Sequence, residues 1–440
     1  MKRSKDLTKG KVSKVFLGFF FPMLFTNFLQ QLYSFVDSVI VGKGLGDNAL
    51  AAVGNISVLA FLIIGFAQGV CNGFAVIVAQ YFGGKDTSRL RKSIAISIKL
   101  AFILSTILTV VSILFLRRIL IVMQTDMEIF DESLQYGNII FGGLLVTMGY
   151  NICSGILRAL GDSKTPLLAI IISSMINIVL DCLFILILKT GVGGAAVATV
   201  LAQLVSVMIC VVGLQKISVI QLSREDFQGD RVLTFELLKN GVPMACMNSV
   251  TAAGCMLIQA YVNSLGVVYT SAYSACNRYI NLFMLPAVTA GFAVSAFTSQ
   301  NWGAKEYGRI KSGVRVGLWI GLVSYLLLGS FMMFFSRPLA QLLLSGKQTI
   351  ELATVFLKIC GSMFFGLNFL FVYRSSLQGM GRPLIPMLSG LLEMVVRILV
   401  IVFLLQEIGF RAAAYAEVLA WTGAFLVNWG AYLKVTRKVN

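Results

Sequence analysis

Four acidic residues, Asp37, Asp181, Glu393 and Glu417, occur inside long apolar segments of the chain. Charged side chains in such segments cost about 2.5–3.5 kcal/mol on insertion scales, and they usually serve a function. Carboxylate, amide and hydroxyl oxygens are hard ligands that suit Na⁺, and a pair of carboxylates can also share a proton. These acids are therefore the first candidates for cation binding.

Residue spacing predicts that several oxygen-bearing side chains lie at one depth. At a rise of about 1.5 Å per residue, Asp37 lies ~9 Å, Asp181 ~12 Å and Thr199 ~8 Å below the outer ends of their helices. Asn177 precedes Asp181 by four residues, so both share one helix face. The sequence thus predicts a cation site of Asp37, Asn177, Asp181 and Thr199. The alternative is that each acid faces lipid headgroups or caps a polar packing contact.

The apolar segments that must position these residues also suggest an internal repeat. Segment 79–85 (AQYFGGK) returns as 299–305 (SQNWGAK), and segment 157–161 (LRALG) returns as 377–381 (LQGMG). The offset of about 220 residues indicates two pseudo-equivalent halves, an arrangement typical of secondary transporters.

The second half differs from the first in its chemistry. By the repeat, Arg397 corresponds to Asn177 and Glu417 to Thr199, while Glu393 lies one helical turn before Arg397. We predict a guanidinium neutralised by Glu393 and Glu417. Two interpretations stay open, a structural salt bridge that ties two helices together and a contact to substrate.

Composition indicates a polytopic membrane protein. Of 440 residues, 58% are hydrophobic and 12% charged, and the mean hydropathy is +0.86. A soluble domain carries about 25% charged residues. A membrane span takes about 20 residues. Twelve segments qualify: 15–41, 50–79, 93–116, 134–156, 166–188, 193–214, 240–264, 270–298, 312–335, 352–376, 384–405 and 411–433.

The predicted fold is therefore an all-α integral membrane protein with 12 transmembrane helices in two pseudo-symmetric six-helix bundles. Residues 1–214 form an N-lobe, residues 215–239 a cytoplasmic linker and residues 240–440 a C-lobe. Because each half holds an even number of spans, both enter the membrane from the same side.

Basic residues predict the orientation. With the N-terminus inside, 25 of the 36 Lys and Arg residues fall in cytoplasmic segments and 8 in external ones. Lys2, Arg3 and Lys5 count with the N-terminus, and Arg374 counts as cytoplasmic. The positive-inside rule then places both termini in the cytoplasm of a cell (plasma or inner) membrane. It also explains the net charge of +17 without nucleic acid as a partner.

Several functional classes are disfavoured. The chain has no histidine, which removes Ser-His catalysis and histidine metal sites. Its eight cysteines include no CxxC pair, and no GxxxxGK[ST] phosphate loop occurs. We expect neither an enzyme nor a bound cofactor.

Several motifs resemble the multidrug and toxic compound extrusion (MATE) family: Pro22-Met23, segment 31–42 (QLYSFVDSVIVG), Leu45-Gly46, Ala79-Gln80 and segment 158–162 (RALGD). The resemblance implies cation-coupled antiport by alternating access of two lobes. In the prokaryotic branch with an N-lobe cation site, the site residues match Asp37, Asn177, Asp181 and Thr199. A second branch has carboxylates on the seventh and eighth helices, and this chain has none between Gly241 and Thr298.

The predicted function is secondary active multidrug efflux, in which cationic or amphipathic compounds leave in exchange for Na⁺ or H⁺. The alternative is a flippase for a lipid-linked saccharide or lipid precursor. A channel or receptor is disfavoured because no repeated filter or large sensory domain occurs. We expect a monomer in the lipid bilayer. Candidate substrate-lining residues are Gln30, Tyr33, Gln68, Asn151 and Gln259.

Overall fold

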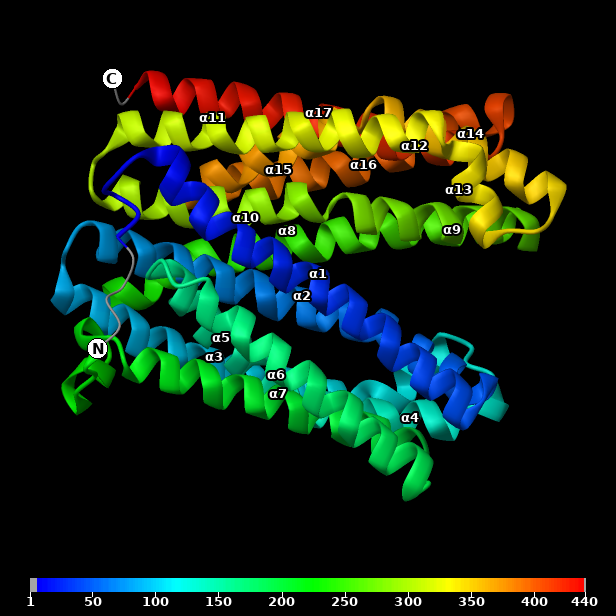
Figure 1. The fold of residues 1–440 in the computed structure, drawn as a ribbon, viewed down its shortest axis with the longest axis horizontal. Helices are drawn as coiled ribbons and strands as arrows, with labels where there is room; N and C mark the ends of the chain where they lie inside the picture. The colour runs from blue at the N-terminus through cyan, green and yellow to red at the C-terminus, as the bar shows by residue number, and fades with distance from the viewer. Residues whose placement is uncertain (1–5, 439–440) are drawn as a thin grey trace. The chain divides into compact units, whose positions relative to one another are not determined.

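The computed structural model describes residues 6–438, apart from the side chains of residues 405 and 406, and all its regular elements in this part are helical (Figure 1). Lys2, Arg3 and Lys5, which are predicted to be cytoplasmic, lie outside the described residues. The prediction of an all-helical fold is confirmed.

The first half supplies the helices that carry the predicted cation site. In order they are α1 (Val12–Leu45), α2 (Asp47–Gly83), α3 (Thr87–Val122), α4 (Met127–Gly142), α5 (Leu144–Ala159), α6 (Lys164–Asp181), the π-helix η1 (Cys182–Ile187) and α7 (Gly191–Gln215). Two short 3₁₀ turns follow, η2 (Ser218–Ile220) and η3 (Arg224–Phe227).

The second half repeats this order with small additions. Its elements are α8 (Arg231–Ser264), α9 (Val267–Phe283), α10 (Leu285–Gly303), α11 (Tyr307–Ser324), the π-helix η4 (Tyr325–Gly329), α12 (Ser330–Phe334), α13 (Ser336–Leu343), α14 (Lys347–Ser362), α15 (Phe364–Gly379), α16 (Leu384–Ile408) and α17 (Arg411–Arg437).

Each predicted span coincides with one helix or with consecutive helical pieces. Among the described residues, eight helices are long and apolar enough to cross a membrane, or eleven when three bent pairs count as single spans. The pairs α4–α5, α9–α10 and α14–α15 bend by 43°, 41° and 47°. The twelfth predicted span is α17, whose apolar run is interrupted by Glu417 and Asn428.

Packing divides the described residues into two units, Phe21–Ala245 with Asp6, and Leu7–Phe20 with residues 246–438. The start of α1 therefore belongs to the second unit, and the start of α8 belongs to the first. Pro22 and Pro243 lie inside α1 and α8, close to these two boundaries. The predicted division at residues 214 and 240 follows the order of spans instead.

The first unit holds α8 by very close contact with α2. A Cβ atom added to Gly73 would lie 2.4 Å from Cα of Gly241, and one added to Gly69 would lie 2.5 Å from Cα of Ala245. Small residues four apart let membrane helices approach each other in this way. Within the same unit, α6 and α7 pack side by side.

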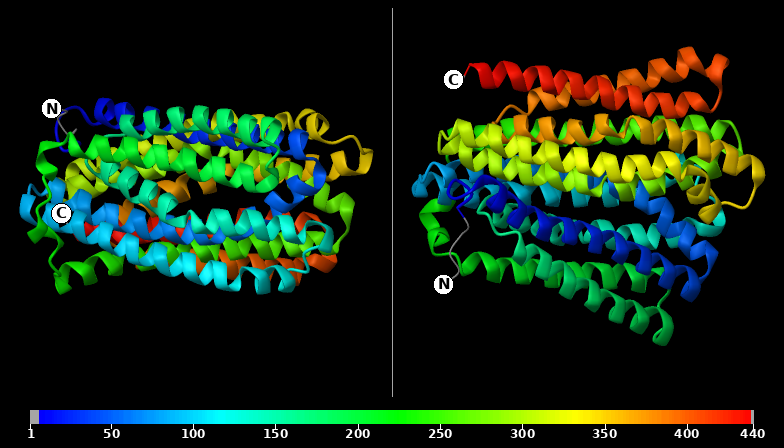
Figure 2. Two further views of the ribbon diagram at one scale, coloured as in Figure 1. Left: turned by 90° about the horizontal axis from the view of Figure 1, so that it is seen from below. Right: turned by 45° about the horizontal axis from the view of Figure 1, so that its top comes forward.

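In the second unit, α16 and α17 run alongside each other, as the orange and red ribbons in the right-hand view of Figure 2 show. The repeat is also visible in the backbone. Gly46 and Gly266 start equivalent helices with φ of 94° and 107°, and Lys85 and Lys305 end equivalent turns with φ of 58° and 61°. The left-handed region favours glycine at the first pair of positions.

The linker is anchored on the first unit by Asp226. Ser223 and Asp226 form a reciprocal capping box around η3, and Arg91 Nε lies 4.0 Å from the Asp226 carboxylate. Hydrogen bonding from the Ser223 backbone N–H, followed by the Ser223 hydroxyl and the charges of Arg91 and Lys92, lowers the pKa of Asp226. Its ionised form therefore stabilises this turn.

The N-terminal residues are clasped within the second unit by Arg309. Its Nη1 donates to Gly10 O at 2.8 Å, its Nη2 to Leu7 O at 3.1 Å, and its Nε to Asn301 Oδ1 at 3.1 Å. Gln300 Oε1 accepts from the Leu7 N–H at 2.9 Å, and the Leu7 side chain is fully buried. The start of α1 is thus fixed by backbone hydrogen bonds as well as by packing.

Candidate functional site

The structure brings together all four residues of the predicted cation site, from α1, α6 and α7. Asn177 and Asp181 are fully buried, while Asp37 and Thr199 are partly exposed. Helix α7 packs against α6, and α1 carries Asp37 to the same cluster. The four residues are referred to below as the acidic cluster.

Asn177 orients the cluster through its amide. With the amide placed so that both ends are satisfied, its Nδ2 donates to Asp181 Oδ2 at 2.5 Å, and its Oδ1 accepts from the Thr199 backbone N–H at 3.2 Å. The i, i+4 spacing on α6 therefore produces a direct contact, and the amide links α6 to α7.

The Asp37 and Asp181 carboxyls lie within hydrogen-bonding reach of each other. One oxygen of each carboxyl, Asp37 Oδ1 and Asp181 Oδ1, is buried and receives no hydrogen bond from a donor among the described residues. Two adjacent carboxylates repel unless a proton or a cation lies between them. The contact can therefore bind a proton, or a cation such as Na⁺ with further oxygen ligands.

Two tyrosines complete the surroundings of the acidic cluster. The hydroxyl of Tyr33, predicted as substrate-lining, is hydrogen bonded to the Thr199 side chain. Tyr136 on α4 is buried beside both carboxyls. Sequence reasoning did not find Tyr136. The available signal was its place near the outer end of the fourth span, the level at which Asp37 was placed.

The backbone changes its winding directly after Asp181. Helix α6 ends at this residue and continues as the π-helix η1, which includes Cys182 and Ile185. π-Helical turns are rare and often occur at functional sites. At the corresponding place in the second half, around Ile401, α16 continues as a regular α-helix. The π-helical turn thus follows Asp181 in the half that has the acidic cluster, and it is absent from the equivalent place in the other half.

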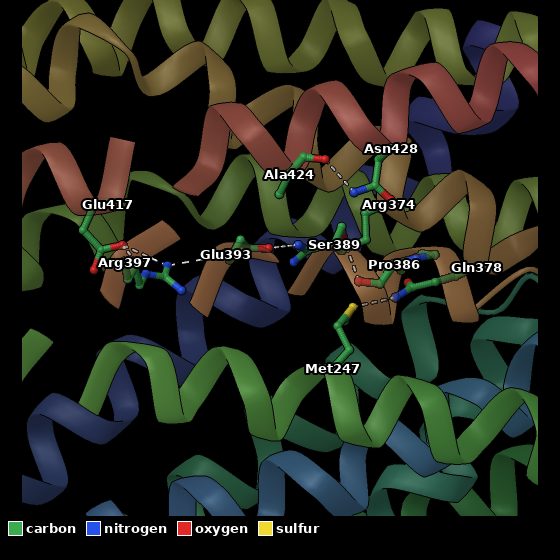
Figure 3. A network of polar contacts seen from close by, with 10 residues as sticks. All are labelled: Met247, Arg374, Gln378, Pro386, Ser389, Glu393, Arg397, Glu417, Ala424 and Asn428. Carbon is green, nitrogen blue, oxygen red and sulfur yellow. Dashed lines mark hydrogen bonds and ion pairs between the residues drawn. The ribbon is translucent and has the colours of Figure 1, made fainter. Parts of the chain in front are cut away.

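The predicted charge cluster of the second half forms a buried network of polar contacts (Figure 3). Arg397 donates to Glu417 Oε2 through Nη2 at 2.9 Å and through Nε at 3.3 Å, and its Nη2 lies 3.8 Å from Glu393 Oε2. Tyr273 OH lies 3.5 Å from the other Glu417 oxygen. The pairing predicted from the sequence is therefore present, and it joins α16 to α17.

Arg374 also belongs to this network, and its position differs from the one predicted. The sequence count places it in a cytoplasmic segment, but its side chain is only 7% exposed and pairs with Glu393. It lies on α15, five residues before the helix ends, where it reaches the neighbouring α16. This buried network contains two arginines and two glutamates, so its formal charges sum to zero.

The other predicted substrate-lining residues are spread over several helices. Gln30, Gln68 and Asn151 are half-buried on α1, α2 and α5 of the first unit. Gln259 is on α8 in the second unit, where its Nε2 donates to Asn263 Oδ1 at 2.8 Å. Contact of these residues with a substrate stays a prediction.

A conventional metal centre is not formed by the described part of the chain. There, no group of three or more His, Cys, Asp or Glu side chains is placed to hold a metal ion. Na⁺ at the acidic cluster would therefore use the two carboxyls together with amide, hydroxyl or backbone oxygens, a donor set that fits a hard cation.

Known proteins resemble the chain along most of its length. The MatE family model matches residues 22–183 and 243–403, one copy in each half. The "Probable multidrug resistance protein YoeA" of Bacillus subtilis is 31% identical, over 76% of this chain and 74% of that protein. An "FAD transporter" of Shewanella oneidensis is 24% identical, over 91% and 89%.

A solved structure of MATE in the bent conformation superposes with a TM-score of 0.93 at 22% identity, over 100% of this chain and 99% of the other. This likeness confirms the fold, including its two repeated halves. Because the MatE family model matches both halves, the chain belongs to this family, which is the MATE family that its sequence motifs resemble.

Proposed function

We propose that this protein is a secondary active multidrug efflux transporter of the cell membrane, which exports cationic or amphipathic compounds in exchange for Na⁺ or H⁺. The observation that carries the proposal is the contact between the carboxyls of Asp37 and Asp181. Two ionised carboxylates repel each other unless a cation lies between them, and protonation of one of them removes the repulsion, so occupancy of the site changes the forces between α1 and α6.

The available driving force is adequate for such a switch. Moving one charge inward across 100 mV supplies about 2.3 kcal/mol. Alternating access then follows if the loaded and empty acidic clusters favour different arrangements of the helices. The named relatives support transport as the activity, and the multidrug name of one relative supports the substrate class.

The flippase alternative receives less support from the buried charges. A pyrophosphate-bearing substrate requires free cations, whereas Arg374 and Arg397 are each paired with a glutamate.

We further propose that the protein acts as a monomer, with both termini in the cytoplasm, and without a cofactor, an enzymatic activity or a nucleic-acid partner.

Efflux of a fluorescent organic cation from proteoliposomes tests the proposal, with Na⁺ and pH gradients imposed separately. Efflux should accelerate with one gradient and reverse its direction when that gradient is reversed. Efflux that ignores both gradients would exclude cation-coupled exchange. A parallel assay with FAD separates an anionic substrate from the cationic class, since one relative is named as an FAD transporter.

A further inference from the structure

A cavity of about 620 Å³ lies in the first unit, away from the acidic cluster. It lies between α3, α5 and α7, and linker residues Ile220, Gln221 and Leu222 contribute to its lining. Ligand pockets usually measure about 300–1,000 Å³ and are mostly apolar with a few polar groups. The lining follows this pattern, because Ser105, Gln215 and Gln221 are its main polar members.

The packing of α5 explains why space remains. Helix α5 packs against both α3 and α7, and it lines the cavity with Met148, Gly149 and Ile152. Gly149 has no side chain to fill the space, and a Cβ added there would make only ordinary contact with Val207 at 3.5 Å. The apolar floor would lose dispersion contacts if the space were empty.

The cavity has an apolar rim. Phe102 on α3, Leu145 on α5 and Val211 on α7 line it and are 58%, 42% and 36% exposed. Exposed apolar side chains are compatible with contact to lipid tails, so this rim would let hydrocarbon enter from the side.

One end of the cavity lies where α7 leaves the apolar layer. Helix α7 is 25 residues long, which corresponds to roughly 37 Å and exceeds the ~30 Å hydrocarbon core. Gln215 is its last residue, and Lys216 follows, with both side chains exposed. This end therefore presents the amides of Gln215 and Gln221 at the level of lipid headgroups, and the exposed cation of Lys216 is next to Gln215 in the chain.

We propose that this cavity holds one acyl chain of a membrane phospholipid whose anionic headgroup lies near Gln215, Lys216 and Gln221. A transported cationic drug is a poorer occupant, because no acidic residue lines the cavity to neutralise it. An anionic lipid meets Lys216 instead. The site is independent of the acidic cluster, so this inference does not depend on the proposed coupling mechanism.

Tryptophan quenching by brominated lipid tests the proposal. The four native tryptophans, Trp302, Trp319, Trp421 and Trp429, all lie in the second unit, so replacing them with Phe leaves the first unit unchanged. In this background, Met148→Trp reports from the cavity and Ile98→Trp provides a second reporter if the first fails to fold. Ile107→Trp, at a 53% exposed position of α3, reports bulk lipid.

The probe is phosphatidylglycerol brominated along its acyl chains, added in small amounts to phosphatidylcholine vesicles. Quenching of the cavity reporters should exceed that of Ile107→Trp by about fivefold at equal lipid composition, the factor that one lysine provides near an anionic surface. Lys216→Glu should remove this excess, and Gly149→Leu should reduce quenching by filling the cavity.

Equal quenching of the cavity and bulk reporters would overturn the proposal. So would an excess that is unchanged in Lys216→Glu, because the headgroup would then have no role. Displacement of the brominated lipid by a fluorescent organic cation, but not by unlabelled phosphatidylglycerol, would assign the cavity to transported compounds and also refute lipid binding.

Discussion

The carboxyl of Asp37 on α1 meets the carboxyl of Asp181 on α6, although 144 residues separate them in the chain. No arginine or lysine neutralises this pair among the contacts that the structure describes. In the second half, by contrast, Arg397 lies between Glu393 and Glu417. The first half therefore needs an external cation or proton for its charge balance, whereas the second carries its own.

Neutralising either member of the carboxyl pair should abolish coupled transport. Asp37→Asn and Asp181→Asn keep side-chain size but remove the charge that an ion or proton must balance. We expect gradient-driven efflux to fall to the background of empty vesicles while the amount of protein in the membrane is unchanged. Asp47→Asn, at an exposed acid of α2, is the matched control and should retain efflux.

Full drug resistance in cells that express Asp37→Asn or Asp181→Asn would contradict this mechanism. Loss of efflux in the Asp47→Asn control as well would indicate a general effect of surface charge.

Residue spacing predicted much of the acidic cluster because depth along a helix follows directly from the rise per residue. It predicts similar depths for Asp37, Asp181 and Thr199, and the four-residue spacing adds Asn177 on the face of Asp181. Rotation about each helix axis is set by neighbours, and a single sequence does not provide it. For this reason the hydrogen bond between the Tyr33 hydroxyl and the Thr199 side chain was not predictable, while contact of Tyr33 with a substrate stays a prediction.

Arg374 illustrates a second limit. Near the end of a predicted span, a basic residue is read as a loop cation, since most such residues are cytoplasmic. Its burial depends on Glu393 of the next helix, a contact between residues 19 positions apart that spacing alone does not reveal. The Arg397–Glu417 pair was predictable because the repeat had already placed both residues.

Removing Arg397 alone should destabilise the second unit. Arg397→Met leaves Glu417 buried without its cation, while Glu393 keeps Arg374, so the cost arises mainly at Glu417. Breaking a buried ion pair costs about 3–5 kcal/mol. The double variant Arg397→Met with Glu417→Met should recover most of this, because apolar replacement of both partners is often neutral.

Reversible denaturant unfolding in mild detergent measures these free energies. A double variant as unstable as Arg397→Met would show that the two charges are not coupled. A stable Arg397→Met variant with impaired efflux would instead favour a substrate contact, the second interpretation of this residue.

The close approach of α2 and α8 should not tolerate a side chain at Gly73. Gly73→Ala places a methyl group 2.4 Å from Cα of Gly241, so the helices must separate. Overpacking of this kind costs about 1–3 kcal/mol. Gly54→Ala on the same helix is the control, because its new Cβ has no atom within 4 Å. Equal unfolding free energies for the two variants would argue against the observed packing.

Acid should release the linker turn held by Asp226. Because hydrogen bonds from Ser223 lower the pKa of Asp226, the stabilisation is complete above the unfolded pKa and is lost as pH falls through the lower, folded value. After correction for intrinsic rates, hydrogen exchange of η3 should stay slow at neutral pH and accelerate below about pH 4. Asp226→Asn should make exchange fast at neutral pH, whereas Glu225→Gln, at an exposed neighbour, should not.

Arg309 should govern the order of the N-terminal residues. Its planar guanidinium donates in three directions, to Gly10 O, Leu7 O and Asn301 Oδ1. Hydrogen bonds from charged groups contribute about 1.5–3 kcal/mol. Arg309→Ala should therefore speed hydrogen exchange of the Leu7 amide by about tenfold or more. Arg309→Lys should rescue only part of the protection, because an ammonium group lacks the fixed fork geometry.

Arg315→Ala, at an exposed position of the same helix, should leave exchange at Leu7 unchanged. Full protection of the Leu7 amide from exchange in Arg309→Lys would mean that the positive charge alone is sufficient for it. Full protection in Arg309→Ala would show that the three hydrogen bonds of Arg309 contribute nothing to the anchoring of α1.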